Sequence, residues 1–215
     1  MDYSLFAFLF TVLFLTTVLL HTTRKNTSAI MLYRVQSLII GAILLKSFYE
    51  TGSLALLIVA LVTIIVKVLA APQFFQSLIK KQALTLSAST YLNTPLTLAA
   101  LVALIAIVHT GIFDPLASLA PMNKDLLSLT LSAIFVSFFL IINRKGAISQ
   151  MLGILSLENT IVAFAFLAGL DQSPSLQIGI LFDIFIWFSV ATIFVAMMYK
   201  HFRSLDVTIM NHLKD

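Results

Sequence analysis

The sequence predicts an all-α, polytopic integral membrane protein, a single bundle of about seven transmembrane helices. Hydrophobic residues make up 60% of the 215 residues and charged residues only 10%, whereas a typical soluble domain carries about 25% charged residues. The apolar residues form continuous runs and do not alternate with polar ones, which argues against a transmembrane β-barrel. A soluble helical protein would not have enough charge to cover so many apolar runs.

Seven runs reach the length of about 20 mostly apolar residues that a helix needs to cross a bilayer. They cover roughly residues 3–20, 29–48, 53–71, 94–112, 125–142, 147–169 and 175–199. All five prolines lie in or near the predicted joints between these runs. We therefore expect one membrane domain over residues 1–215.

Basic residues gather after alternate runs and predict the orientation of the bundle. They follow the first, third, fifth and seventh runs as Arg24 and Lys25, Lys80 and Lys81, Arg144 and Lys145, and Lys200, Arg203 and Lys214. The opposite ends carry mostly acidic residues, with Lys124 as an exception. The positive-inside rule places the basic side in the cytoplasm. The prediction is a multi-pass protein of the cell (cytoplasmic) membrane with its N-terminus outside and its C-terminus in the cytoplasm.

The segment between the third and fourth runs, "APQFFQSLIKKQALTLSASTYLNTP", allows two interpretations. Lys80 and Lys81 lie among Phe74, Phe75 and Leu78, a pattern typical of an amphipathic helix lying along the membrane interface. An irregular loop with scattered apolar residues fits equally well.

Composition excludes several functions. The chain has no cysteine, so it cannot ligate an iron–sulfur or nickel–iron centre through thiolates. Its four histidines are not at metal-ligand spacing, and no phosphate loop or nucleophile elbow is present. We expect no catalytic residue, no metal and no cofactor in this chain. Because topology explains the positive charge, no nucleic-acid partner is implied.

Two acids lie inside predicted spans. Glu158 is about 11 residues into the sixth run and Asp183 about 8 residues into the seventh, so they lie ~16 Å and ~12 Å deep at 1.5 Å per residue. A charge at such a depth costs at least ~2.5–3.5 kcal/mol, and burial favours the protonated acid. A carboxyl group that is neutral in one state and charged in another suits a proton path. Each acid could instead stay neutral and join two helices by a hydrogen bond.

Other polar residues accompany the acids. Lys67, in "TIIVKVLAAP", is a third candidate for the path, but it is placed about a turn from the cytoplasmic end and could simply extend to the interface. Asn159, next to Glu158, is more typical of a hydrogen bond between helices than of function. A short "GLDQSPS" connection makes the last two runs neighbours. Gly179 lies one turn before Asp183 on the same face, where a small residue lets another helix approach.

Several stretches resemble the E component of hydrogenase-4. The stretches are "NRKGAISQMLGILSLENTIVAF", "LQIGILFDIFIWFSVATIFVAMMYKHF", "YRVQSLII" around Gln36, "VKVLAAP" around Lys67 and the tail "SLDVTIMNHLK". This family comprises membrane subunits of group 4 nickel–iron hydrogenase and formate hydrogenlyase complexes. Its last two spans are similar in turn to the K-type subunit of respiratory complex I, which carries an acid in each of two adjacent helices. Glu158 and Asp183 would occupy those positions, although complex I commonly has Glu at the second.

The resemblance implies a non-catalytic subunit of an oxidoreductase complex. Such a subunit would sit between the membrane anchor of a soluble redox arm and large antiporter-like membrane subunits. Its acids would belong to a hydrophilic path along the membrane that moves protons or other ions. Two alternatives stay open: a stand-alone secondary transporter, and a purely structural scaffold whose acids stay protonated.

Overall fold

The computed structural model describes residues 3–81, 89–117 and 123–169, together with scattered positions between 178 and 197. Every named element in these residues is a helix. The elements are α1 (Tyr3–Thr22), α2 (Asn26–Thr51), α3 (Leu54–Thr63), the π-helix η1 (Ile64–Ala70), α4 (Ala71–Lys81), α5 (Thr94–Val108), the 3₁₀-helix η2 (Gly111–Phe113), α6 (Asp114–Ala117), α7 (Lys124–Asn143) and α8 (Ala147–Leu167). This confirms the predicted all-helical class for the described residues.

Five helices are long and apolar enough to cross a membrane. They are Ser4–Thr22, Asn26–Thr51, Leu54–Ser77, Lys124–Asn143 and Ala147–Leu167. The fourth predicted run, 94–112, forms the shorter helix α5, which ends at Val108. Most of the seventh run, 175–199, lies outside the described residues. The count of seven therefore stays a prediction.

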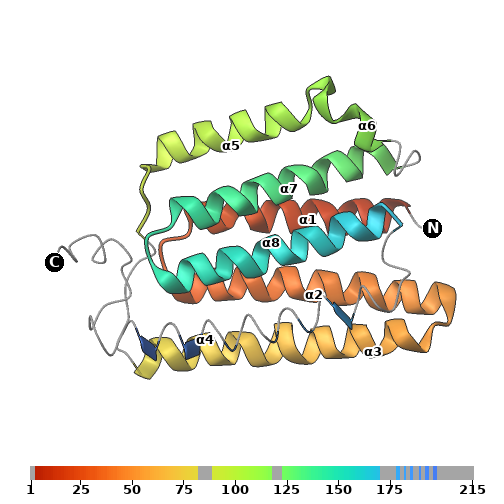
Figure 1. Ribbon diagram of the computed structural model, residues 1–215, viewed down its shortest axis with the longest axis horizontal. Helices are drawn as coiled ribbons and strands as arrows, with labels where there is room; N and C mark the ends of the chain where they lie inside the picture. Colours follow the sequence, from red (N-terminus) through yellow and green to blue (C-terminus); the bar gives the residue numbers. More distant parts are fainter. Residues whose placement is uncertain are drawn as a thin grey trace.

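The third run extends well beyond its predicted end at residue 71. α3, η1 and α4 follow one another without a gap from Leu54 to Lys81, and Figure 1 shows them as one long rod. Pro72 lies inside this rod and not at a joint. The π-helical segment directly precedes Pro72, whose ring leaves the backbone without one N–H donor for the hydrogen bonds of the helix. The irregular-loop interpretation is thus wrong for residues 71–81.

Four helices, α1, α2, α7 and α8, form the centre of the bundle. α8 packs against α7 and α2, and α1 packs against the same two helices. α5 lies along the outer side of α7, while the rod from α3 to α4 lies along the outer side of α2 (Figure 1). The turn from α2 to α3 is tight because Gly52 adopts a left-handed conformation with φ of 66°, which glycine tolerates without steric cost.

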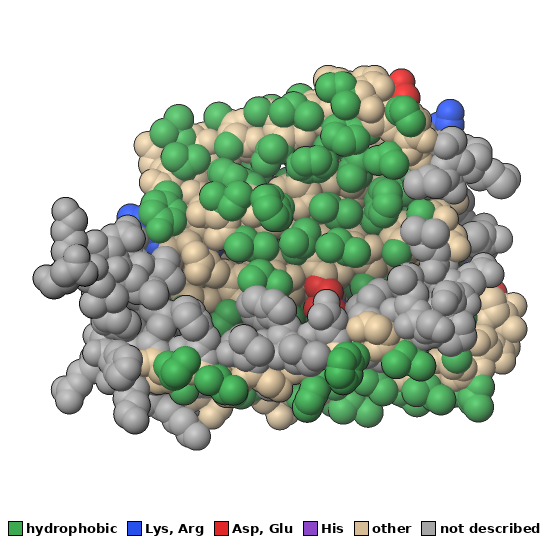
Figure 2. Space-filling view, viewed as in Figure 1, with side chains coloured by type: hydrophobic (Ala, Val, Ile, Leu, Met, Phe, Trp, Pro, Cys, Tyr) green, Lys and Arg blue, Asp and Glu red, His purple; other side chains and the backbone are tan. Residues whose placement is uncertain are grey.

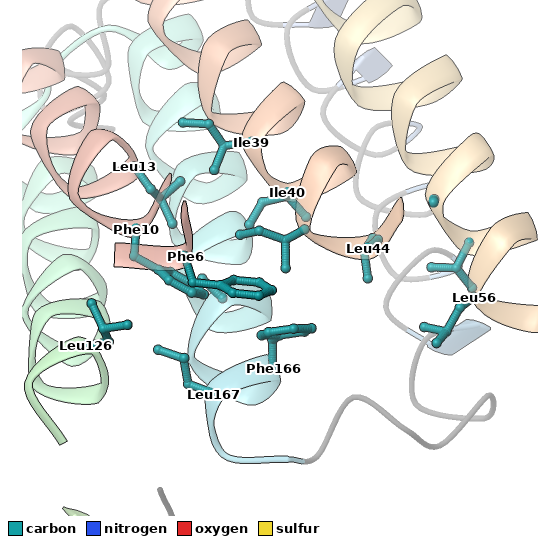
Figure 3. Close-up of a cluster of buried hydrophobic side chains, with 14 of the residues drawn as sticks. Phe6, Phe10, Leu13, Ile39, Ile40, Leu44, Leu56, Leu126, Phe166 and Leu167 are labelled. Carbon is teal, nitrogen blue, oxygen red and sulfur yellow. The ribbon is translucent and has the colours of Figure 1, made fainter. Parts of the chain in front are cut away.

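The buried apolar side chains form two separate clusters at different heights in the bundle. The first, called the basic-end cluster, comprises residues such as Leu20, Tyr33, Phe75, Leu140 and Leu152. The second, called the acidic-end cluster, is shown in Figure 3. In it, Phe6 and Phe10 of α1 meet Phe166 of α8, with the Phe6 and Phe166 ring centroids 5.4 Å apart. Together the two clusters hold the four central helices at both ends.

The outer surface is apolar over most of the length of the helices. Figure 2 shows hydrophobic side chains across the middle of one face, with basic and acidic atoms towards the ends and one acidic patch near the centre. Large apolar side chains such as Phe8, Val102 and Phe138 are more than half exposed. Such a surface would be unfavourable in water and suits contact with lipid tails.

Candidate functional site

A layer of buried polar side chains separates the two apolar clusters. On each helix the polar residues lie between a member of the basic-end cluster and a member of the acidic-end cluster; on α1, for example, Thr17 lies between Leu13 and Leu20. The polar layer comprises Thr17, Gln36, Ser37, Lys67, Ser137, Ser156 and Asn159. All seven side chains are almost completely inaccessible, so each must find its partners within the protein.

Lys67 lies in the polar layer and is only 1% exposed. Its Nζ lies 3.3 Å from Oε1 of Glu158. The same Nζ donates a hydrogen bond of 2.9 Å to Oδ1 of Asn159. Two consecutive residues of α8 therefore hold one ammonium group that projects from η1.

Asn159 continues this contact into a third helix. Its Nδ2 donates a hydrogen bond of 3.1 Å to Oγ of Ser37 on α2. The amide oxygen faces the lysine and the amide nitrogen faces the serine, so both ends of the side chain are used. Glu158, Lys67, Asn159 and Ser37 form one connected group, which we call the lysine network.

The lysine network joins the protein interior to its outer face. The Glu158 side chain is 22% exposed, whereas Lys67, Asn159 and Ser37 are buried. An ammonium and a carboxylate in a medium of low dielectric attract strongly, yet each also loses its hydration. Transfer of one proton from Lys67 to Glu158 would turn the ion pair into a neutral pair. The arrangement can thus hold a proton on either of two side chains, one fully enclosed and one 22% exposed.

The local backbone around Lys67 is a π-helix, η1, and not a regular α-helix. A π-helix widens the turn and is found mostly in single turns, often at functional sites. Here the segment packs against α2, and its Lys67 reaches Glu158 and Asn159 of α8. Ile65, two residues earlier, faces outwards and is 57% exposed. The π-helical segment therefore has an exposed apolar side and a buried polar side.

The interpretation of Lys67 as a residue extending to the interface is wrong. It assumed that the helix ends near residue 71, but the helix runs on from Lys67 to Lys81, roughly 20 Å at 1.5 Å per residue. The lysine is also buried and paired, not exposed. Its pairing with Glu158 was not anticipated from the sequence, and neither was the role of Ser37.

Asp183 lies outside the described residues, so its predicted proximity to Glu158 stays a prediction. Gly179 is described and exposed, and no described atom lies within 4 Å of a Cβ placed there. The expected close approach of another helix to Gly179 is therefore not seen within the described part of the chain.

Gln36 also lies in the polar layer, where its contact is with α1 and not with Lys67. Its Nε2 donates to Oγ1 of Thr17 at 3.0 Å, which links α2 to α1. A third contact joins α7 to α8, with the hydroxyl oxygens of Ser137 and Ser156 separated by 3.2 Å. These two pairs join uncharged groups on neighbouring helices, although Oε1 of Gln36 has no hydrogen-bond partner among the described residues. They differ in this respect from the charged lysine network.

Comparisons with known proteins do not identify a relative. No protein family, no curated protein and no solved structure matches the chain significantly. In the described residues, no group of three or more His, Cys, Asp or Glu side chains is arranged to hold a metal ion. The lysine network is therefore interpreted from its own chemistry.

Proposed function

We propose that this chain is a membrane-arm subunit of a complex I-like, redox-driven complex of the hydrogenase-4 or formate hydrogenlyase type. It contributes Glu158, Lys67 and Asp183 to a path for protons or other ions and links larger membrane subunits. The redox complex and the partners come from the resemblance of the sequence. The observation that carries the ion path is the buried pair of Lys67 and Glu158, with a separation of 3.3 Å between Nζ and Oε1.

A buried ion pair at this position is better explained by a role in transport than by a role in stability. Ion pairs in a dry interior are weak stabilisers, because desolvation offsets most of the attraction. Polar residues within membrane helices commonly mark ion or proton pathways. The partial exposure of Glu158 gives the pair a side from which a proton can arrive. We expect this side, together with Asp183, to face an antiporter-like subunit and not lipid.

The proposed arrangement in the cell membrane has seven spans, with the N-terminus outside and the C-terminus in the cytoplasm. Arg24, Lys25, Arg144 and Lys145 all follow helix ends at one end of the bundle, which supports a cytoplasmic position for that end.

The test is proton uptake by the complete complex in proteoliposomes. Glu158→Gln keeps the shape of the side chain but removes its exchangeable proton. We expect coupled uptake per assembled complex to fall by about tenfold or more, as for other proton-transfer groups, while the complex still assembles. Asp183→Asn should behave alike, and the double variant should be little worse than either single variant.

Ser156→Ala is the matched control, because it removes a buried hydroxyl on the same helix that contacts Ser137 and not Lys67. Where Glu158→Gln assembles poorly, Lys67→Met with Glu158→Gln removes both charges and keeps the test decisive. Normal uptake in an assembled complex carrying Glu158→Gln would favour a structural scaffold. Transport by the purified chain alone would instead favour a stand-alone transporter.

A further inference from the structure

Two consecutive residues of α8 offer acceptors of different kinds to Lys67. Glu158 can give or take a proton, whereas the amide oxygen of Asn159 can only accept a hydrogen bond. Nζ of Lys67 lies closer to the amide, at 2.9 Å from Oδ1, than to the carboxyl group, at 3.3 Å from Oε1. A hydrogen bond from a charged donor is about twice as strong as one between neutral groups. The amide contact therefore favours the ammonium form of Lys67 over the neutral amine.

The orientation of the Asn159 amide also fits an ammonium group. The opposite orientation would direct Nδ2 at Nζ and place N–H donors on both sides of the contact. Ser37 does not decide between the two orientations, because its hydroxyl can accept from Nδ2 or donate to Oδ1. The charge of Lys67 decides, and it is the amide oxygen that meets Nζ. All three side chains are at most 1% exposed, so water cannot replace the amide as the acceptor.

The helices packed against η1 are α2, α3 and α4. α3 has no ionisable side chain, and the two lysines of α4 are its last two residues, Lys80 and Lys81. The ionisable side chains of α2 are Tyr33, Arg34, Lys46, Tyr49 and Glu50. All of these except Tyr33 are at least partly exposed, and Lys46 pairs with Glu50. Tyr33 interacts electrostatically with Glu158, but a phenol is neutral at pH 7. Glu158 is thus the counter-charge that the described residues give to Lys67.

We propose that Asn159 is a positioning residue that keeps the shared proton on Lys67, so that the pair rests with Glu158 ionised. A proton that arrives at the exposed side of the pair then forms an O–H bond with the Glu158 carboxylate while Lys67 stays an ammonium. Release of a proton from Nζ breaks an N–H bond and leaves a neutral amine, which the amide oxygen disfavours. This direction of transfer rests on the proposed function, whereas the charge of Lys67 at rest can be measured without transport.

The experiment is ¹⁵N NMR of the purified full chain in detergent, with the lysines labelled at Nζ and the pH varied. The Lys67 signal is identified by its loss in Lys67→Met, and we expect an ammonium at pH 7 in the unmodified chain. The titration is followed in a Glu158→Gln background, which removes the counter-charge and brings the deprotonation of a buried lysine into an accessible range. There, Asn159→Leu keeps the size of the side chain, removes the acceptor and should lower the midpoint by about one pH unit or more.

Two further variants make the result specific. Gln36→Met is the matched control, because it removes a buried amide of the polar layer that contacts Thr17 and not Lys67; it should leave the midpoint unchanged. Asn159→Asp keeps the shape of the side chain and supplies a charged acceptor in place of the one lost from Glu158, so it should raise the midpoint.

A neutral amine on Lys67 at pH 7 in the unmodified chain would overturn the proposal. Equal shifts in Asn159→Leu and Gln36→Met would also overturn it, because any lost amide would then loosen the polar layer alike. Where Asn159→Leu does not fold, Asn159→Asp decides alone, and a midpoint that does not rise would mean that position 159 does not act on the lysine. The proposed function fails separately: normal proton uptake by a complex carrying Glu158→Gln would reject the ion path and leave the measured charge of Lys67 as it is.

Discussion

Lys67 and Glu158 carry opposite charges in a part of the molecule where neither charge would be stable alone. A single charge near the centre of a bilayer costs at least about 2.5–3.5 kcal/mol. The pair lowers this cost by mutual attraction, and Asn159 lowers it further by accepting from Nζ. The two residues do not contribute equally, because Lys67 is fully enclosed and Glu158 is 22% exposed. Removing one partner should therefore have a different effect from removing the other.

The first prediction uses this asymmetry. Glu158→Gln leaves a buried ammonium group without its counter-charge and should lower the free energy of unfolding by about 3 kcal/mol. Lys67→Met leaves a carboxyl group that can take up a proton or contact its surroundings, so the loss should be about 1 kcal/mol. The double variant should lose no more than about 1 kcal/mol, since no unpaired charge remains. Unfolding of the purified protein in mixed micelles measures all three values.

The outcome for the double variant is decisive. If the losses of the two single variants simply add, the residues act independently and the 3.3 Å contact has no energetic meaning. Ser137→Ala is the control for the loss of an uncharged contact in the polar layer, and it should cost about 1 kcal/mol.

At the scale of elements, α7 and α8 lie so close at Gly153 that a methyl group there would require the neighbouring atoms to shift by a few tenths of an ångström. A Cβ placed on Gly153 of α8 would lie 3.0 Å from Cγ1 and 3.3 Å from the backbone nitrogen of Ile141 on α7. The loop between these helices is only three residues long, because α7 ends at Asn143 and α8 begins at Ala147. This approach brings Ser156 of α8 to Ser137 of α7.

The second prediction follows from this close packing. Gly153→Ala should push α8 away from α7 and lower the free energy of unfolding by about 1–3 kcal/mol, the usual effect of overpacking. Gly179→Ala is the control, because no described atom lies within 4 Å of a Cβ at that position. Unfolding of the isolated chain in micelles compares the two variants. A Gly153→Ala protein as stable as the control would show that the helices separate without cost.

The sequence was informative about elements whose signals are local. Continuous apolar runs placed α1, α2, α7 and α8 correctly to within a few residues. The predicted start of the fourth run at residue 94 also agrees with α5. Pro95 lies in its first turn, and Asn93 caps the helix by accepting from the N–H of Leu96. Pro72 was misleading, because a proline usually breaks a helix but here follows a π-helical turn within a continuous rod.

The candidate site was harder to predict, because the signals that reveal it are not local. An error of several residues in the end of the third span moved Lys67 from the centre of the bundle to its edge. Its partner Glu158 lies 91 positions away in the sequence, and no periodic pattern connects the two. Ser37 gave no signal, since a serine in an apolar run usually satisfies its own backbone. Glu158 itself was recognisable because an acid at mid-span is costly wherever the helix packs.

At the scale of the whole molecule, exposed charges lie mainly at the two ends of the bundle, and the outer surface between them is mostly apolar. Arg24, Lys25 and Lys145 lie at one end, where Lys145 also stacks over the ring of Tyr91 at 5.1 Å. Glu50 and Asp125 lie at the other end. Positive charge stays on the cytoplasmic side during insertion. This asymmetry therefore predicts the orientation of the chain in a cell membrane.

The last prediction tests that orientation directly and relies on the absence of cysteine from the chain. Single cysteines are introduced as Glu50→Cys and Lys25→Cys, both at exposed helix ends, and Phe138→Cys serves as a control on the apolar outer face of α7. A membrane-impermeant maleimide added to intact cells should label Glu50→Cys and leave Lys25→Cys unlabelled until the cells are opened. Phe138→Cys should stay unlabelled in both cases, because a thiol within hydrocarbon does not ionise or meet the reagent. Labelling of Lys25→Cys in intact cells, with Glu50→Cys protected, would reverse the orientation and place the basic end outside the cytoplasm.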